Sequence, residues 1–406
     1  MAQYSPPYPP YDPTDKTGST ETVVKRWPVI LTGVIDSVYS VNHDLTGLLD
    51  KADKLEEGKA LIAAMSRLKY DMSRDRALEP IPDDGEALVD QYNAELARIE
   101  VRGQNTWFTA PWLYAEYRFV RSLFATSQHW KLFDPFFAQK SNAYQASGTA
   151  VHQLAATLAE LESEKDIISN DPEKLKVLFH EMTQMCLCLL TNMTPGDIEH
   201  LQTIGRDAQN ARKEFILKND QDAVWEHITT LEDARIDFVL DNGNLFTDLV
   251  FADFLVSHTQ YISKVVFHPK SIPWFVSDVT PPDFAALLDV ASLPRGPAPE
   301  HLERAIARWN AYLANGTFAL FVPRDAPIGT PNERVDFWTS PWPYWDMRLR
   351  APKVWDALSE SGLVIFKYVY LWRDRLTGDI RWPVDTPFET AVGEARVCRL
   401  ASGMFP

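Results

Sequence analysis

The stretch from residue 236 to residue 283 constrains the fold more than any other part of the chain. It holds two short apolar runs, 238–240 and 274–276, and an aspartate follows each run within two residues. Between the runs, residues 245–261 carry apolar side chains at helical spacing. A strand, a crossover helix and a second strand form the unit from which parallel sheets are built. The stretch therefore predicts an α/β fold.

Three polar side chains of this stretch are candidate metal ligands. Parallel sheets bind their ligands beyond the carboxyl ends of the strands, where Asp241, Asn242 and Asp278 are expected to converge. Carboxylate and amide oxygens are hard donors that suit Mg²⁺ or Mn²⁺. A second interpretation stays open, because Asp-Asn-Gly-Asn is also a turn signal and an aspartate after a strand is often a helix cap. Asp248 is likewise either a group that supports the site or part of a solvated helix face.

The rest of the chain predicts three regions. Residues 1–20 form a Pro- and Tyr-rich extended arm, because proline removes a backbone donor and restricts the residue before it. Residues 21–175 show helical periodicity and predict an all-helical lobe, whereas strand-like and helical runs alternate over 176–406. The expected architecture is an α-β-α sandwich, Rossmann-like with a mostly parallel sheet, next to an N-terminal helical lobe.

Composition excludes several classes of partner. The formal net charge of −16 argues against nucleic acid and anionic membranes, which need a basic surface. Three cysteines give no disulfide framework. No signal peptide is recognised at Met1 and no apolar run reaches 18 residues. The expectation is a cytoplasmic protein without membrane insertion, with its oligomeric state left open.

Four segments carry a resemblance to a known family: 107–119, 241–242, 274–278 and 363–388. With them the chain resembles the metal-dependent damage-control phosphatases, also called acidic-residue methyltransferase-1-like or domain of unknown function 89. The resemblance covers nearly the whole chain. It implies an α-β-α sandwich, a divalent metal on Asp241, Asn242 and Asp278, and hydrolysis of small phosphate esters.

The chain departs from the family pattern around the expected chemistry. Where the family has Ser/Ala-Gly-Phe-Glu after the Asp-Asn pair, this chain has only Gly243-Asn244. After Lys367 the polar family sequence Gly-Asp-Leu-Asn-Tyr-Arg is replaced by the aromatic run 368–372 and Arg373. Near the C-terminus the family's Arg-Thr-x-Lys becomes Arg396-Val-Cys-Arg399. A cationic cluster beside an aromatic wall is the result.

This combination leads to a leading hypothesis of terpene cyclisation, because aromatic faces stabilise carbocations and exclude water. The pattern also resembles fungal humulene-synthase-type cyclases, which implies a Mg²⁺-dependent sesquiterpene cyclase, a lyase of fungal secondary metabolism that ionises farnesyl diphosphate to a humulene-like hydrocarbon. The expected substrate-binding residues are Lys367, Arg373, Arg396 and Arg399 for diphosphate and Tyr368, Tyr370, Trp372 and Trp274 for the apolar chain. The alternatives are a phosphatase acting on a more apolar phosphate ester, and a degenerate member that binds a ligand without turnover.

Overall fold

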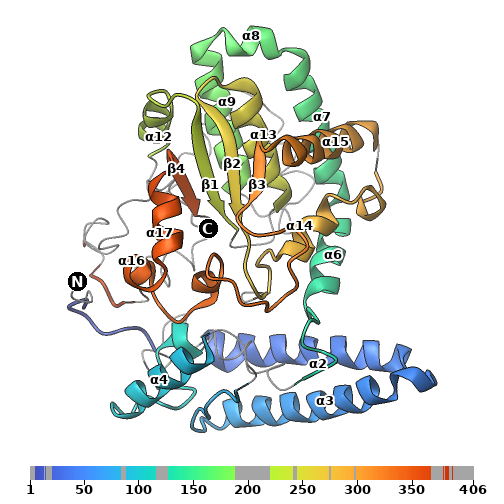
Figure 1. Ribbon diagram of the computed structural model, residues 1–406, viewed down its shortest axis with the longest axis vertical. Helices are drawn as coiled ribbons and strands as arrows, with labels where there is room; N and C mark the ends of the chain where they lie inside the picture. Colours follow the sequence, from blue (N-terminus) through green and yellow to red (C-terminus); the bar gives the residue numbers. More distant parts are fainter. Residues whose placement is uncertain are drawn as a thin grey trace.

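The computed structural model describes most of the chain and defines a mixed α/β architecture (Figure 1). The described residues are 5–12, 14, 21–83, 88–115, 127–187, 220–240, 245–273, 276–296, 299–366, 378, 380–383 and 386. The helices before the sheet are α2 (Trp27–Asp44), α3 (Ala52–Ser73), α4 (Val89–Glu100), α6 (Phe137–Ala146), α7 (Gly148–Ser163), α8 (Lys165–Ser169), α9 (Pro172–Leu187) and α12 (Gln221–Ile228). The strands and later helices are β1 (Ala234–Val239), α13 (Leu245–His258), β2 (Ile262–His268), α14 (Pro281–Leu287), α15 (Pro299–Asn315), β3 (Phe318–Leu320), α16 (Met347–Arg350), α17 (Pro352–Ser359) and β4 (Leu363–Phe366).

The described strands form one parallel sheet in the order β3-β2-β1-β4. Val239 at the end of β1 lies level with His268 of β2 and with Phe366 of β4, so the strands end at a common edge. The predicted α/β class, with a helical N-terminal region, is confirmed. The strand that pairs with β1 is β2. Of the run 274–276, predicted as a strand, the structure describes only Val276, which lies in a bend; Trp274 and Phe275 lie outside the described residues.

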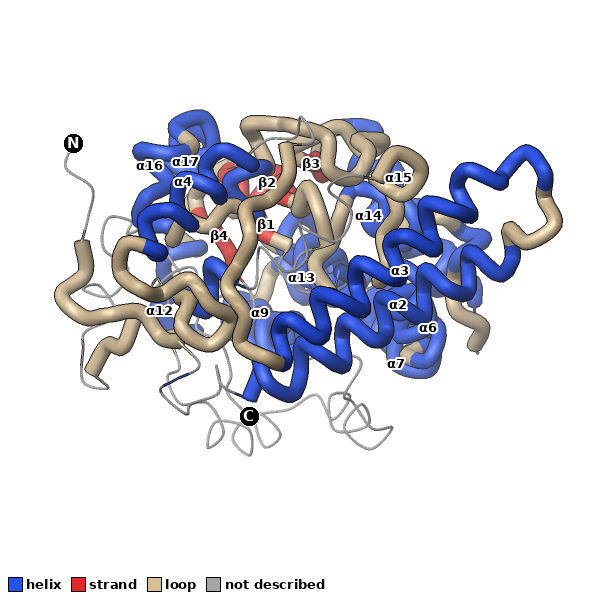
Figure 2. The backbone as a smooth tube through the Cα atoms, turned by 90° about the horizontal axis from the view of Figure 1, so that it is seen from below, coloured by secondary structure: helices blue, strands red, loops and turns tan. Residues whose placement is uncertain are grey.

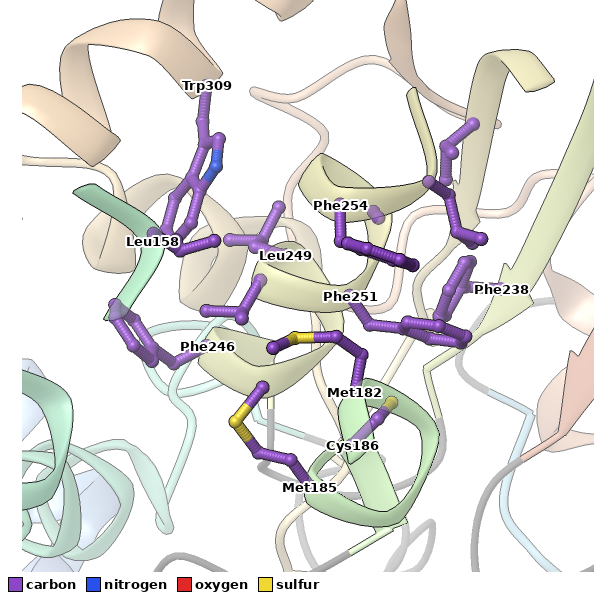
Figure 3. Packing of buried hydrophobic residues seen from close by; sticks show 14 of the residues in the cluster. Leu158, Met182, Met185, Cys186, Phe238, Phe246, Leu249, Phe251, Phe254 and Trp309 are labelled. Carbon is purple, nitrogen blue, oxygen red and sulfur yellow. The ribbon is translucent and has the colours of Figure 1, made fainter. Parts of the chain in front are cut away.

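One face of the sheet is covered by α13, with α7, α9 and α15 around it. Every residue of α13 from Leu245 to Leu255 is buried, as expected of a helix that is hydrophobic on all sides. Figure 3 shows side chains of this helix in the same cluster as Phe238 of β1 and Trp309 of α15; those of the helix are Phe246, Leu249, Phe251 and Phe254. Each buried aromatic or aliphatic side chain stabilises the fold by about 1.5–3 kcal/mol. The core therefore holds α13 firmly against the sheet.

The opposite face is covered by shorter elements. Alternate residues of the strands, Val239, Val364 and Phe366, point into a second cluster. The side chains that cover them come from 335–347 and from α17, and include Trp338, Tyr344, Met347, Val354 and Leu358. Helices on both faces are what a parallel sheet requires, because its strands are buried on both sides.

The described part of the helical lobe consists of α2, α3, α4 and residues 107–115 and 127–136, which share a separate hydrophobic cluster. Helices α2 and α3 lie side by side as a long pair (Figures 1 and 2). The lobe lies below the sheet in Figure 1, and Ile272 and Val276, which follow β2, pack against its core. Tyr92 of α4 also donates a hydrogen bond to the Thr339 carbonyl oxygen at 2.8 Å. The lobe is thus joined to the segments beyond the carboxyl end of the sheet.

The N-terminal arm contacts both the lobe and the C-terminal part of the chain. Pro10 pairs with Ile380 in an antiparallel bridge, and the amide of Arg381 donates to the Pro9 carbonyl at 2.9 Å. The amide of Trp112 in the lobe donates to the Tyr11 carbonyl at 3.1 Å. The boundaries 20/21 and 175/176 stay predictions. Among the described helices, none is both long and apolar enough to cross a bilayer.

A buried ion pair in this core generates a first prediction. The Asp253 carboxylate is fully buried and accepts hydrogen bonds from Arg308 Nε at 2.9 Å and Trp309 Nε1 at 2.8 Å. Arg308→Met leaves this carboxylate without its cation, which is expected to lower the free energy of unfolding by about 3–5 kcal/mol. Urea denaturation measures the loss. Arg304→Met, on an exposed position of the same helix, should change stability by less than about 0.5 kcal/mol; equal losses in both variants would contradict the assignment.

A second prediction concerns pH. Burial lowers the pKa of His258, so the folded protein keeps this ring neutral at a pH where the unfolded chain, with a pKa near 6.5, takes up a proton. The unfolded state then binds more protons, and stability falls as pH decreases from about 7.5 to about 5.5. His258→Gln should reduce the slope of unfolding free energy against pH, by at most about 1.4 kcal/mol per unit. His43→Gln, at an exposed position, should leave the slope unchanged.

Candidate functional site

The strand order places a candidate site at the carboxyl ends of β1 and β4. From β1 the chain proceeds outward to β2 and β3, and then returns to the other side of β1 as β4. Ligands of open parallel sheets bind at such a reversal of strand order, just outside the carboxyl ends. Strand β1 ends at Val239 and β4 ends at Phe366. The amide of Leu240, the last described residue after β1, donates to the His268 carbonyl at 3.0 Å. Asp241 and Lys367 are the next residues in sequence, and both lie outside the described residues.

The segment between β2 and α14, residues 269–280, supplies the described part of this edge; we call it the β2–α14 loop. Asp278 in this loop is 1% exposed and Lys270 is fully buried. The Lys270 amide donates to the Val279 carbonyl at 2.9 Å, which brings the two ends of the loop together. The Lys270 ammonium lies 5.6 Å from the ring centre of Trp338, within cation-π range. The loop therefore holds a buried carboxylate and a buried cation at the edge of the sheet.

The backbone of this loop is strained next to Asp278. Val276 has φ +52°, in the left-handed region that β-branched residues rarely adopt. Such a conformation costs about 1–3 kcal/mol and persists only where the surrounding structure enforces it. Strain of this kind clusters at functional sites, which marks the turn before Asp278 as a candidate.

A partly buried ion cluster links the β2–α14 loop to α6. Lys140 Nζ lies 2.7 Å from Asp134 Oδ2, 2.5 Å from Asp283 Oδ2 and 3.4 Å from the Asp278 carbonyl oxygen. Asp283 also accepts from the Thr280 amide at 2.8 Å and the Thr280 hydroxyl at 2.7 Å. Burial raises the pKa of Asp134. Burial alone would lower the pKa of Lys140, but the charges of Asp283 and Asp134 outweigh it and raise that pKa. The ammonium therefore stays charged and bridges two elements.

A second buried network lies on the opposite face from α13. Arg235 Nε donates to Asp237 Oδ2 at 2.8 Å, and His268 Nε2 lies 2.7 Å from Asp237 Oδ1. Burial lowers the pKa of His268, so the ring is neutral and donates through Nε2. Burial would raise the pKa of Asp237, but the bonds from His268 and the Arg235 charge lower it. His268 is a buried residue of β2, and sequence periodicity could not reveal its role because its surroundings include Trp338 and Phe321 from distant segments.

The first turn of α13 lies against α9 below the same edge. Asp248 is 1% exposed and accepts a hydrogen bond from Cys186 Sγ at 3.3 Å. The interpretation of Asp248 as part of a solvated helix face is therefore wrong. Its carboxylate lies four residues after the undescribed segment 241–244.

Of the predicted site residues, the structure describes Asp278 alone. Asp241, Asn242, Trp274, Lys367, Tyr368, Tyr370, Trp372, Arg373, Arg396 and Arg399 lie outside the described residues. Within the described part of the chain, no three His, Cys, Asp or Glu side chains form a complete metal site. The buried Asp278 carboxylate has the hard oxygen chemistry that a divalent cation needs, so it fits one ligand position. Sequence reasoning missed three further residues near this edge, Lys140, Lys270 and Asp283. Single lysines and a helix-capping aspartate form no recognisable sequence motif.

Comparison with known proteins identifies the family. The family model described as "Damage-control phosphatase ARMT1-like domain" matches residues 22–402. The protein named damage-control phosphatase ARMT1 from Danio rerio is 29% identical over 394 residues, which cover 91% of this chain and 83% of that protein. The Homo sapiens protein of that name is 29% identical over 395 residues, which cover 91% of this chain and 84% of that protein. The Xenopus tropicalis protein of that name is 30% identical over 396 residues, with 91% and 84% covered. The comparison with a DUF89 family protein from Pyrococcus horikoshii covers 68% of this chain and 74% of that protein at 14% identity, with a TM-score of 0.34.

These relatives overturn part of the sequence interpretation. The prediction of a sesquiterpene cyclase, a lyase acting on farnesyl diphosphate, is wrong, because the matching family and the relatives along 91% of the chain are phosphatases by name. The predicted isoprenoid diphosphate substrate and the predicted humulene product are wrong for the same reason. A requirement for a divalent cation is consistent with the family. The match over residues 22–402 shows that the chain belongs to the family of damage-control phosphatase ARMT1-like domains.

Proposed function

We propose that this chain is a divalent-metal-dependent phosphatase that hydrolyses a small phosphate ester with an apolar organic group. The observation that carries the proposal is the Asp278 carboxylate, buried at the common carboxyl edge of the sheet on a strained and anchored loop. A buried carboxylate is costly unless charge or hydrogen bonds compensate it, and a divalent cation compensates it well. Membership of a phosphatase family supports the reaction class.

In this proposal Asp241, Asn242 and Asp278 hold Mg²⁺ or Mn²⁺. Asp241 and Asn242 follow the end of β1, the strand that flanks the reversal of strand order, in sequence. Their oxygen donors match the preference of both ions. The bound ion supplies a Lewis acid for the charge that develops on the phosphoryl oxygens.

The remaining predicted residues bind the substrate. The cations Lys367, Arg373, Arg396 and Arg399 neutralise and orient the phosphate, because guanidinium and ammonium groups donate several hydrogen bonds to its oxygens. Tyr368, Tyr370, Trp372 and Trp274 contact the organic group of the ester, and their apolar faces favour an apolar ester over a polyhydroxy one. In the reaction the P–O bond of the ester breaks. Water adds its oxygen and one hydrogen to the phosphorus, and its other proton goes to the alcohol, which keeps its own oxygen.

The test compares esters and metals directly. Release of inorganic phosphate is measured from a sugar phosphate and from an aryl phosphate, with Mg²⁺, with Mn²⁺ and after chelation of metals. We expect hydrolysis that depends on the metal and a higher kcat/KM for the aryl ester. Asp278→Asn should lower kcat/KM by at least about a hundredfold, as expected when a group that stabilises the transition state is removed, and should weaken Mn²⁺ binding in calorimetry.

Asp325→Asn is the matched control, because Asp325 is exposed in the loop after β3. It should leave both activity and Mn²⁺ affinity unchanged. An Asp278→Asn protein with normal activity removes the assignment of the metal ligand. A wild-type chain that binds Mn²⁺ and phosphate but hydrolyses neither ester would instead support the non-catalytic binding alternative, for which the shortened Asp241–Asn244 segment is the reason.

A further inference from the structure

We propose that Lys140 of α6 is a positioning residue that fixes the backbone around Asp278 and makes metal binding depend on the helical lobe. This inference rests on the proposed role of Asp278 as a metal ligand. Nothing in the sequence marks Lys140, since it is a single lysine in a helix of low amphipathicity, 138 residues before Asp278.

The contacts of the Lys140 ammonium carry the proposal. All three of its oxygen partners lie within 3.4 Å, and two of them, the Asp278 carbonyl and the Asp283 carboxylate, belong to the segment that contains the proposed ligand. The third partner, Asp134, precedes α6 and accepts the Phe136 amide at 2.8 Å. Phe136 is buried in the hydrophobic cluster of the helical lobe. The ammonium thus connects the core of the lobe to the backbone at Asp278.

Independent contacts fix the same loop on its other sides. The Asp283 carboxylate accepts two hydrogen bonds from Thr280, and the Lys270 amide donates one to the Val279 carbonyl. Ile272 and Val276 pack against the lobe, and Ser271 Oγ lies 2.9 Å from Thr339 Oγ1. Unlike these contacts, the charged ammonium group of Lys140 lies close to the carbonyl oxygen of Asp278 itself. Side chains that ligate a metal need such support, and its removal typically reduces metal affinity by about 10- to 100-fold.

The obvious variant combines two effects that must be separated. Lys140→Met breaks the bridge but also leaves the buried Asp134 and the partly buried Asp283 as neighbouring carboxylates without their cation, which destabilises the fold. The double variant Lys140→Met/Asp134→Asn removes one of these charges, while the new amide oxygen can still accept the Phe136 amide. It restores the charge balance but not the bridge.

The experiment measures order, metal affinity and activity in the full chain. Amide hydrogen exchange by mass spectrometry follows peptides that cover residues 276–284 without metal, and calorimetry gives the Mn²⁺ dissociation constant. In the double variant we expect at least about tenfold faster exchange in these peptides and a 10- to 100-fold weaker Mn²⁺ affinity, with thermal stability closer to wild type than in Lys140→Met. The Lys174→Met control, which breaks an exposed pair with Glu164, should change neither readout.

The outcomes distinguish this inference from the proposed function. Normal exchange and Mn²⁺ affinity in the double variant overturn the positioning role, even if the wild-type chain is a phosphatase. Faster exchange with weaker Mn²⁺ binding supports the role, even if the wild-type chain hydrolyses no ester. A wild-type chain that binds no Mn²⁺ overturns both. If activity is present, the loss in the double variant should be largely recovered at saturating Mn²⁺, which a general structural defect would not allow.

Discussion

Parallel pairing of β1 with β2 on one side and β4 on the other is the constraint on which the rest of the structure depends. Parallel strands cannot be joined by tight turns, so helices must cross over the sheet and bury both of its faces. Here α13 covers one face and the segment 335–347 with α17 covers the other. Because the pairing is in register, the strands end together, and every segment that leaves the sheet starts at one edge.

That edge is completed by the helical lobe rather than by the sheet alone. The β2–α14 loop packs with Ile272 and Val276 on the lobe and is bound by Lys140 of α6. An unfavourable backbone conformation at Val276 is maintained by these contacts. The lobe therefore has a direct mechanical connection to the one candidate metal ligand that the structure describes.

The error about the reaction has an identifiable physical cause. Aromatic side chains after Lys367 and beside Asp278 were interpreted as a wall that stabilises a carbocation, but an aromatic wall also binds the apolar part of an ordinary phosphate ester. Side-chain chemistry alone does not separate these uses, because both need a metal, cations and apolar contact. Similarity along 91% of the chain to proteins named as phosphatases decides between them.

The sequence by itself determined the features that follow from local pattern. Apolar spacing predicted α13, the run at 236–240 predicted β1, and their order predicted the α/β class, since periodicity reflects the faces that each element buries. Tertiary structure decided the rest. It placed Val276 in a bend packed against the helical lobe, buried His268 and Asp248, and brought Lys140 to the carbonyl of Asp278. These outcomes depend on contacts between residues far apart in the chain, and such contacts leave no periodic trace in the sequence.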